Sequence, residues 1–264
     1  MNYWTKRSIY LSGNSNYLEL LYEVYPVSLA NPRRELLPEQ IEAIRTAYDN
    51  HDDSQLLNSL LDLDIFPIKN SYVAYLRRDR GAISRNPRIA ESIIYELYRL
   101  GIDEILNRCT APKESNRQMS ELFKQWIGSG AIGLPVVNDP EEFLRRDDNC
   151  ILNESDQVNR DFAAKYLGFR RNKGVDFLAK FHNKYVAGEA KFLSEIGGNQ
   201  NNQFADAVQS MHSFSGSRFP VIPIAILDGV LYFPNSSKIY KYLNNNPQDN
   251  IMSALLLREF LYSL

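Results

Sequence analysis

The sequence has few of the residues on which secreted, zinc-binding and membrane proteins depend. It contains two cysteines, Cys109 and Cys150, and three histidines in 264 residues. Two cysteines without paired spacing argue against a disulfide framework, and so few thiols and imidazoles argue against a zinc site. No apolar run approaches the roughly 20 residues that a membrane-spanning helix needs, and the first residues lack the apolar stretch of a secretory signal. We therefore expect a protein of the reducing cytoplasm, with no membrane segment.

The chain is also close to electrically neutral. The chain has 30 Lys and Arg residues against 32 Asp and Glu residues, a formal net charge of -2. A strongly basic protein would bind any nucleic acid through its phosphates, whereas a sequence-selective enzyme can keep positive charge local. Near-neutrality therefore leaves nucleic acid open as a partner. Two local basic clusters are present: Arg77, Arg78, Arg80, Arg85 and Arg88 in one, and Arg170, Arg171 and Lys173 in the other. Each cluster alone is also typical of a solvated protein surface.

The first half of the chain has helical periodicity. The length permits one large domain or one domain with a helical elaboration. Helices are predicted over Pro38–Tyr48, Ser54–Leu63, Pro87–Leu100 and Ser115–Ile127, followed by a connector over residues 128–140. We therefore expect a helical N-terminal elaboration over residues 1–113 and a core over residues 114–264.

After Gly168 the pattern changes to that of an α/β fold. A helix predicted over Asn153–Leu167 ends there, and two alternating stretches then flank His182 and Asn183, as in a β-hairpin. The predicted elements are strands over Val175–Phe181, Tyr185–Phe192 and Pro220–Leu227, a polar segment over Gly197–Asn202 leading into a helix to about Phe214, a short strand over Leu231–Phe233, and helices from Ser236 and from Met252. Pro223 indicates a sheet edge or a bulge within its strand.

Three chemically active side chains fall on the hairpin. Because side chains alternate along a strand, Glu189 and Lys191 share one face. If His182 and Asn183 form the turn, Asp176 lies opposite Glu189. If the turn moves on by one residue, Asp176 lies opposite Lys191. In either register the three groups gather on one face of the strand pair.

Such a grouping has an electrostatic cost, since two carboxylates across a strand pair repel each other. The Lys191 ammonium offsets part of this repulsion, and a bound divalent cation offsets all of it. Oxygen ligands at this density suit Mg²⁺ or Mn²⁺, which keep several waters and accept phosphate oxygens. Lys191 can orient a water for attack on phosphorus, and the metal lowers the pKa of that water. An ordinary cross-strand ion pair gives the same sequence pattern.

The stretches Gly174-Val175-Asp176-Phe177 and Gly188-Glu189-Ala190-Lys191-Phe192 resemble the PD-(D/E)XK nuclease motif, most closely that of type II restriction endonucleases. The resemblance covers about residues 155–230, although Val175 stands where the motif has Pro. It implies a restriction-endonuclease-like core, a mixed central sheet flanked by helices. It also implies that Asp176, Glu189 and the Ala190 carbonyl bind magnesium and that Lys191 assists the water. Some relatives add an acid from the preceding helix, for which the candidates are Glu154, Asp156 and Asp161.

Polar residues on both sides of the motif are candidates for contacts with DNA. The amides of Asn199, Gln200, Asn201, Asn202 and Gln203 can pair with adenine or contact phosphates at the start of a helix. Any one of them alone also fits a polar loop with Asn199 as helix cap. Arg170, Arg171 and Lys173 precede the first hairpin strand, where they can meet the phosphate backbone.

These features predict a type II restriction endonuclease that hydrolyses both strands of a short double-stranded DNA site with Mg²⁺, which Mn²⁺ can replace. A palindromic target implies a homodimer, because the symmetry of the protein then matches that of the DNA. Two alternatives remain open: a repair or recombination nuclease of the same fold, and a non-catalytic DNA-binding α/β module in which the three groups form a surface ion network.

Overall fold

The computed structural model describes residues 1–13, 16–26, 35–111, 115–195, 198–234 and 237–264, with the side chains of all but residues 115–117 and 199. The chain forms two compact units, one comprising Met1–Ser28 and Ser115–Leu264 and the other Leu29–Glu114. One boundary between the two units falls between Glu114 and Ser115, whereas the sequence suggests one between residues 113 and 114. The first residues, which we had grouped with the N-terminal elaboration, belong to the same unit as the C-terminal half.

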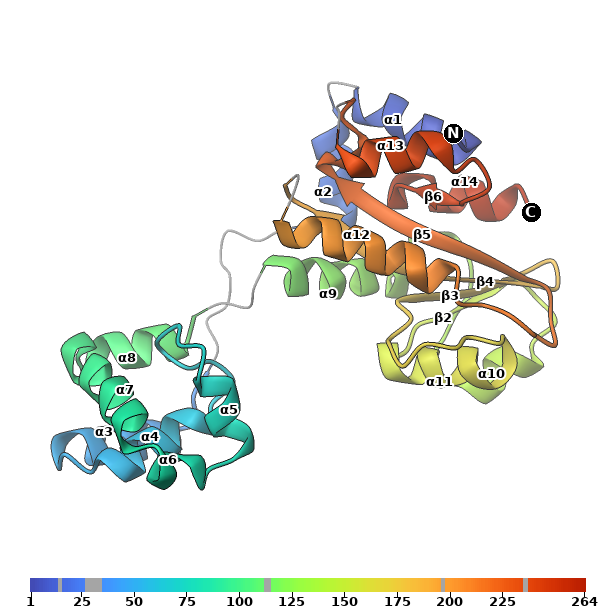
Figure 1. Ribbon diagram of the computed structural model, residues 1–264. Helices are drawn as coiled ribbons and strands as arrows, with labels where there is room; N and C mark the ends of the chain where they lie inside the picture. Colours follow the sequence, from blue (N-terminus) through green and yellow to red (C-terminus); the bar gives the residue numbers. More distant parts are fainter. Residues whose placement is uncertain (14–15, 27–34, 112–114, 196–197, 235–236) are drawn as a thin grey trace. The chain divides into compact units, whose positions relative to one another are not determined.

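The first unit is built on a six-stranded sheet whose strands lie in chain order (Figure 1). The strands are β1 (Val136–Val137), β2 (Cys150–Leu152), β3 (Phe177–Phe181), β4 (Lys184–Leu193), β5 (Val221–Gly229) and β6 (Ile251–Met252). The pairs β1–β2, β4–β5 and β5–β6 are parallel, and β2–β3 and β3–β4 are antiparallel. A mixed sheet flanked by helices confirms the predicted fold class.

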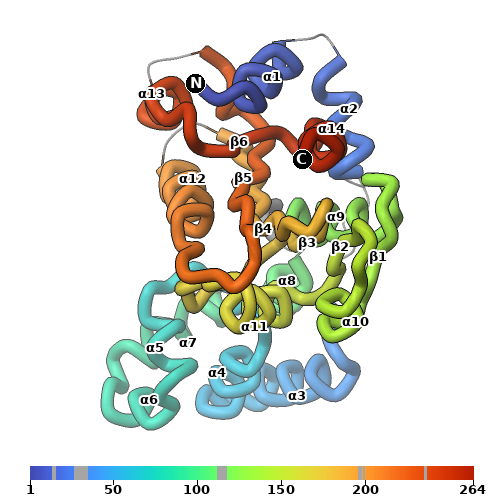
Figure 2. The backbone as a smooth tube through the Cα atoms, turned by 90° about the vertical axis from the view of Figure 1, so that its right-hand side faces the viewer, coloured from blue at the N-terminus to red at the C-terminus, as the bar shows by residue number. Residues whose placement is uncertain are grey.

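Helices cover both faces of this sheet. They are α1 (Tyr3–Ser12), α2 (Tyr17–Val24), α9 (Ser115–Gly128), α10 (Pro140–Arg145), α11 (Asp156–Tyr166), α12 (Gly198–Met211), α13 (Lys238–Asn245) and α14 (Leu257–Tyr262), with the 3₁₀ helices η1 (Val230–Tyr232) and η2 (Ala254–Leu256). Figure 2 shows α9 and α12 on opposite sides of β4. None of the helices in the described parts of the chain is long and apolar enough to cross a membrane.

The residues of β4 alternate between two differently packed faces. Val186 and Ala190 point into an apolar cluster with α2, α9 and α14. On the other face, Tyr185 packs in a cluster with α10 and α11, and Leu193 packs in another with α12 and α13. The positions between these two clusters on that face include Glu189 and Lys191. The strand therefore carries its polar residues in the interval between two apolar clusters.

The turn between β3 and β4 sets their register. His182 and Asn183 both have positive φ, 46° and 64°, as a two-residue type I′ turn requires. Phe181 then pairs with Lys184, and the ladder runs to Phe177 opposite Gly188. Of the two registers that the sequence allowed, the one with His182 and Asn183 in the turn is confirmed, and the shifted one is wrong.

Pro223 lies on the sheet edge, as its residue type predicts. β5 pairs with β4 along its whole length but with β6 only at Ala225 and Ile226. Pro223 has no N–H to donate. Its backbone nitrogen therefore lies on a side of β5 that has no strand partner at this position among the described residues.

Several predicted elements near this sheet were wrong. The connector expected over residues 128–140 contains β1 and the first residue of α10. Instead of a strand over Leu231–Phe233, the 3₁₀ helix η1 covers Val230–Tyr232. The helix expected from Met252 begins only after β6. The polar segment over Gly197–Asn202 is mostly part of α12, which starts at Gly198. The helix expected from Asn153 begins at Asp156, where the Ser155 hydroxyl caps it by accepting from Val158 N.

In the described residues of the second unit, 35–111, all regular secondary structure is helical. Its helices are α3 (Pro38–Asp49), α4 (Asp53–Leu61), α5 (Val73–Arg78), α6 (Ala82–Arg85), α7 (Pro87–Leu100) and α8 (Ile102–Cys109). Ile44, Leu56, Ile93 and Leu97 are fully buried in its core. This confirms the prediction of a mostly helical N-terminal half, with the α3 and α7 bounds within one residue of those expected.

Candidate active site

Asp176, Glu189 and Lys191 converge at the start of the β3–β4 hairpin. Asp176 stands one residue before β3, and the other two lie on β4. The Lys191 ammonium is 3.0 Å from Asp176 Oδ2 and 2.8 Å from Glu189 Oε1. The three side chains therefore share one face of the strand pair, as the alternation of the two strands predicts.

Backbone groups hold Asp176 in this place. Its N–H donates to the Gly188 carbonyl over 3.1 Å, which continues the antiparallel ladder by one bond. Its carboxylate accepts a hydrogen bond of 2.8 Å from Ala190 N. The Ala190 carbonyl in turn accepts from the Lys191 ammonium over 3.1 Å. Ala190 thus presents its backbone to the site while its side chain packs in the core.

The two carboxylates are withdrawn from water. The side chain of Asp176 is 8% exposed and that of Glu189 is 4% exposed, while Lys191 keeps 21%. Burial raises the pKa of the Asp176 carboxyl, and the negative charges of Asp156 and Glu189 raise it further, against the opposing effect of Lys191. Burial also acts to raise the pKa of Glu189, but the charge and hydrogen bond of Lys191, the Ser210 hydroxyl and the charge of Lys173 together outweigh it and hold that pKa below its usual value.

Lys191 remains a cation in this setting. Burial alone would lower its pKa, but the carboxylates of Asp176 and Glu189 raise it well above the ordinary value. The cluster then contains one positive charge for two acids. This excess of acid over base favours a further cation.

One oxygen of the cluster has no hydrogen-bond partner among the described residues. Glu189 Oε2 is buried and unpaired, a costly condition for a carboxylate oxygen. The described residues contain no group of three or more His, Cys, Asp or Glu side chains that could hold a metal ion. Two carboxylates and a backbone carbonyl nevertheless suit Mg²⁺, which binds one or two carboxylates and keeps several waters. The donor set at Asp176, Glu189 and Ala190 therefore fits this ion.

Of the three additional acids considered from the sequence, Asp156 is the one whose charge acts on Asp176. It begins α11, and its carboxylate forms an ion pair with Lys124 of α9. Glu154 accepts from Ser155 N, and the exposed Asp161 pairs with Arg160. The ion pair of Lys124 with Asp156 could not be predicted from the sequence, because Lys124 lies far from the motif along the chain.

Gly174 lets the chain pass close to Asp156. A Cβ on Gly174 would lie 2.5 Å from the Cβ of Asp156, too close for two carbon atoms. The next residue, Val175, donates its N–H to the Asp156 carbonyl over 3.2 Å. Glycine at this position therefore allows the segment before β3 to bring Asp176 into the cluster.

The basic cluster before β3 has three different environments. Arg170 is exposed. Arg171 is bound to α12, with 2.8 Å to Asp206 Oδ1 and 2.7 Å to Ser210 Oγ. Lys173 also forms an ion pair with Asp206 and lies 3.8 Å from Glu189 Oε1. Lys173 thus borders the carboxylate cluster, while Arg171 fastens the segment to α12.

The amide-rich stretch forms the start of α12. Asn202 is exposed, and Asn201 and Gln203 are half-buried. Gln200 is only 4% exposed and donates to the Ser194 hydroxyl over 3.3 Å. We had expected Gln200 to face DNA from the surface, but its amide points inward. The side chain of Asn199, also a predicted DNA contact, lies outside the described residues.

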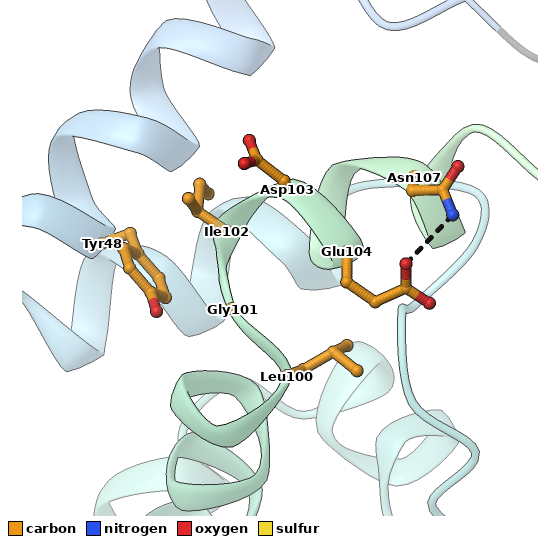
Figure 3. A pocket seen from close by; sticks show the side chains of 7 residues that line it. All are labelled: Tyr48, Leu100, Gly101, Ile102, Asp103, Glu104 and Asn107. Atoms are coloured by element: carbon orange, nitrogen blue, oxygen red, sulfur yellow. Dashed lines mark hydrogen bonds between the residues drawn. The ribbon is translucent and has the colours of Figure 1, made fainter.

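The helical unit contains a cavity, which is a second candidate site. It has a volume of about 690 Å³ and is lined by Tyr48, Asn107 and the segment from Leu100 to Glu104. Figure 3 shows the side chains of Asp103 and Glu104 directed away from each other, and Glu104 accepts from Asn107 over 3.1 Å. The two acids do not converge on one point, so this cavity lacks the grouping found at Asp176.

The first unit thus has a mixed sheet flanked by helices, with Asp176, Glu189 and Lys191 gathered at the start of the β3–β4 hairpin. The chain belongs to the Tsp45I type II restriction enzyme family, whose model matches residues 2–264. It is therefore a restriction endonuclease, a hydrolase that binds and cleaves DNA. This favours neither of the two alternatives, the repair nuclease and the non-catalytic module. No curated protein and no solved structure matches the chain.

Proposed function

We propose that this restriction endonuclease cleaves DNA at a PD-(D/E)XK-type centre formed by Asp176, Glu189 and Lys191, with Mg²⁺ as cofactor and Mn²⁺ as a substitute. The observation that carries the proposal is the convergence of the three side chains, with the Lys191 ammonium within 3.0 Å of both carboxylates. The unpaired, buried Glu189 Oε2 supports the metal.

Asp176, Glu189 and the carbonyl of Ala190 would hold the ion. When bound, Mg²⁺ lowers the pKa of a water and stabilises the charge that develops on the phosphate. Lys191, charged at neutral pH, orients the attacking water and neutralises part of the same charge. Lys173, beside Glu189, is placed to contact a phosphate oxygen of the substrate.

The remaining parts of the proposal concern DNA and assembly. Exposed Arg170, together with Asn201, Asn202 and Gln203 at the start of α12, would contact the duplex on either side of the cluster. The first unit would be the nuclease core and the helical unit its elaboration. A short palindromic target would be cleaved by a homodimer. The cytoplasmic location stays a prediction from the sequence.

The direct test is digestion of a fully sequenced plasmid with Mg²⁺, followed by mapping of the fragment ends. Lys191→Met should slow cleavage by about 10²–10³-fold, the usual loss when one electrostatic stabiliser of a transition state is removed. Lys165→Met, which removes an exposed lysine of α11, is the matched control and should cleave at the wild-type rate. Equal rates for both variants would exclude Lys191 from the chemistry.

Metal binding is tested separately by titration calorimetry with Mg²⁺ in the presence of DNA. Asp176→Asn should abolish the binding signal, whereas Asp161→Asn, which changes an exposed acid of α11, should retain it. An unchanged signal in the Asp176 variant would contradict the proposed ligand set. Sedimentation of the protein with and without its mapped site tests the homodimer.

A further inference from the structure

The helical unit separates its charges along the chain. Between residues 35 and 111 there are nine lysines and arginines and 13 acidic residues. Six of the nine basic residues, but only Asp79 of the acidic ones, fall within residues 69–88. That segment has a formal net charge of +5, and the rest of the described unit has a formal net charge of -9. Such a division is unlike the mixed charges of an ordinary solvated surface.

Residues 69–88 have one side packed in the core of the unit and the other side exposed to solvent. On α5, Val73 and Leu76 are buried, whereas Tyr72 and Tyr75 are 55% and 62% exposed. Arg78, at the end of α5, is exposed as well. The helix therefore directs its apolar residues inward and presents tyrosine and arginine to solvent.

Three of the six basic residues in this segment are engaged by other groups of the described unit. Arg80 pairs with Asp62, Arg85 pairs with Asp79, and Arg77 donates to the carbonyls of residues 63 and 64. Lys69, Arg78 and Arg88 are exposed, and no acid of the described chain lies within ion-pair distance of them. Their charges are available to a partner.

The three basic residues elsewhere in the described part of the unit, residues 35–111, are all paired. Arg45 pairs with Asp103, Arg99 with Glu96, and Arg108 with Glu104. The cavity of Figure 3, with its two acids, also belongs to this acidic part. A polyanion would be repelled there and attracted to residues 69–88.

We propose that Lys69, Tyr72, Tyr75, Arg78 and Arg88, here called the basic surface, contact the phosphate backbone of the DNA substrate. This rests on the DNA-cleaving function and assigns the helical unit a part in it. Unpaired Lys and Arg side chains that contact DNA phosphates displace the counterions condensed on the DNA, which favours binding. Tyrosine hydroxyls and backbone contacts commonly fix a protein's register on a duplex. No base contact is needed, so the basic surface contributes affinity for any sequence.

The test is the salt dependence of duplex binding by the full-length protein, measured by fluorescence anisotropy in EDTA to prevent cleavage. In R78A/R88A, binding should weaken several-fold, and the plot of log K against log salt should become less steep by about 1.8, since each lost phosphate contact removes about 0.9. R45A/R99A removes two exposed, paired arginines from the same unit and should keep the wild-type slope.

A third variant, R78K/R88K, keeps both charges and should restore the slope, which separates loss of charge from loss of folding. If R78A/R88A matches the wild type in slope and affinity, the basic surface is not a DNA contact, even if the enzyme cleaves. If the wild-type protein binds no duplex, the result contradicts the DNA-cleaving function itself and not only the role of the basic surface.

Discussion

Asp228 gives the protein a pH-dependent stability that can be measured separately from catalysis. It lies on β5 with no solvent exposure, in the core of the first unit. It accepts hydrogen bonds from Tyr25 Oη over 2.8 Å and Ala254 N over 3.2 Å, and from the Ser253 hydroxyl. Burial nevertheless raises the pKa of this carboxyl from 3.8 to about 6, because these donors only partly replace its hydration.

The sign of the effect follows from the raised pKa. The folded state binds a proton at Asp228 more tightly than the unfolded state does, so its contribution to the free energy of unfolding is fully present below pH 3.8. It is lost as the pH rises through about 6. A shift of about 2 units corresponds to about 3 kcal/mol in total, of which about 2 kcal/mol falls between pH 4 and pH 7.5.

The assay is urea unfolding of the wild type and of Asp228→Asn across that pH range. The substitution changes the hydrogen bonds by an amount that is independent of pH, so the difference between the two free energies isolates the titration of Asp228. That difference, wild type minus variant, should fall by about 2 kcal/mol from pH 4 to pH 7.5. A flat difference, or one that rises with pH, would refute the raised pKa.

Two further changes test how Asp176 is positioned and tuned. Gly174→Ala would place a Cβ 2.5 Å from that of Asp156, and the resulting displacement should slow DNA cleavage by about 10²-fold; Gly13→Ala meets only ordinary contacts and should leave the rate unchanged. Asp156→Asn removes a negative charge that raises the Asp176 pKa, so the acidic limb of the pH–rate profile should move to lower pH. Asp161→Asn should not move it, and an unmoved limb in both variants would contradict the coupling.

The convergence of Asp176, Glu189 and Lys191 could be predicted because its geometry is local. Alternation along two strands, and a turn that fits His182 and Asn183, fix which side chains face each other without reference to the rest of the fold. The positive φ of His182 and Asn183 then shows which of the two predicted registers the hairpin adopts. The identity of the family rests on the match over residues 2–264.

The elements that were missed depend on tertiary contacts. β1, β2 and β6 have only two or three residues, too few for alternation to show. The helices α1 and α2 were not expected to belong to the core, because only packing against α9 and α14 places them there. Lys124 reaches Asp156 from another helix, and nothing in the local sequence announces such an ion pair.

The inward orientation of Gln200 shows how one boundary changes a functional prediction. With the helix starting at Gly198, Gln200 shares a stripe with Phe204, Ala207 and Met211, all buried. These positions follow the helical period. A helix start placed after residue 202 put Gln200 in a solvated loop instead. The correct start would have assigned it to the core from the sequence alone.

The order of elements along the chain makes the helical unit an insertion into the first unit. Residues 29–114 fall between α2 and α9, and these two helices pack in one apolar cluster through Leu21 and Phe123. Both ends of the insert are therefore anchored in the same hydrophobic core, and the chain after α9, which carries Asp176, Glu189 and Lys191, is not interrupted. Such an insert can be exchanged or diversified while the sheet and its carboxylate cluster are inherited unchanged, so the two units can evolve separately.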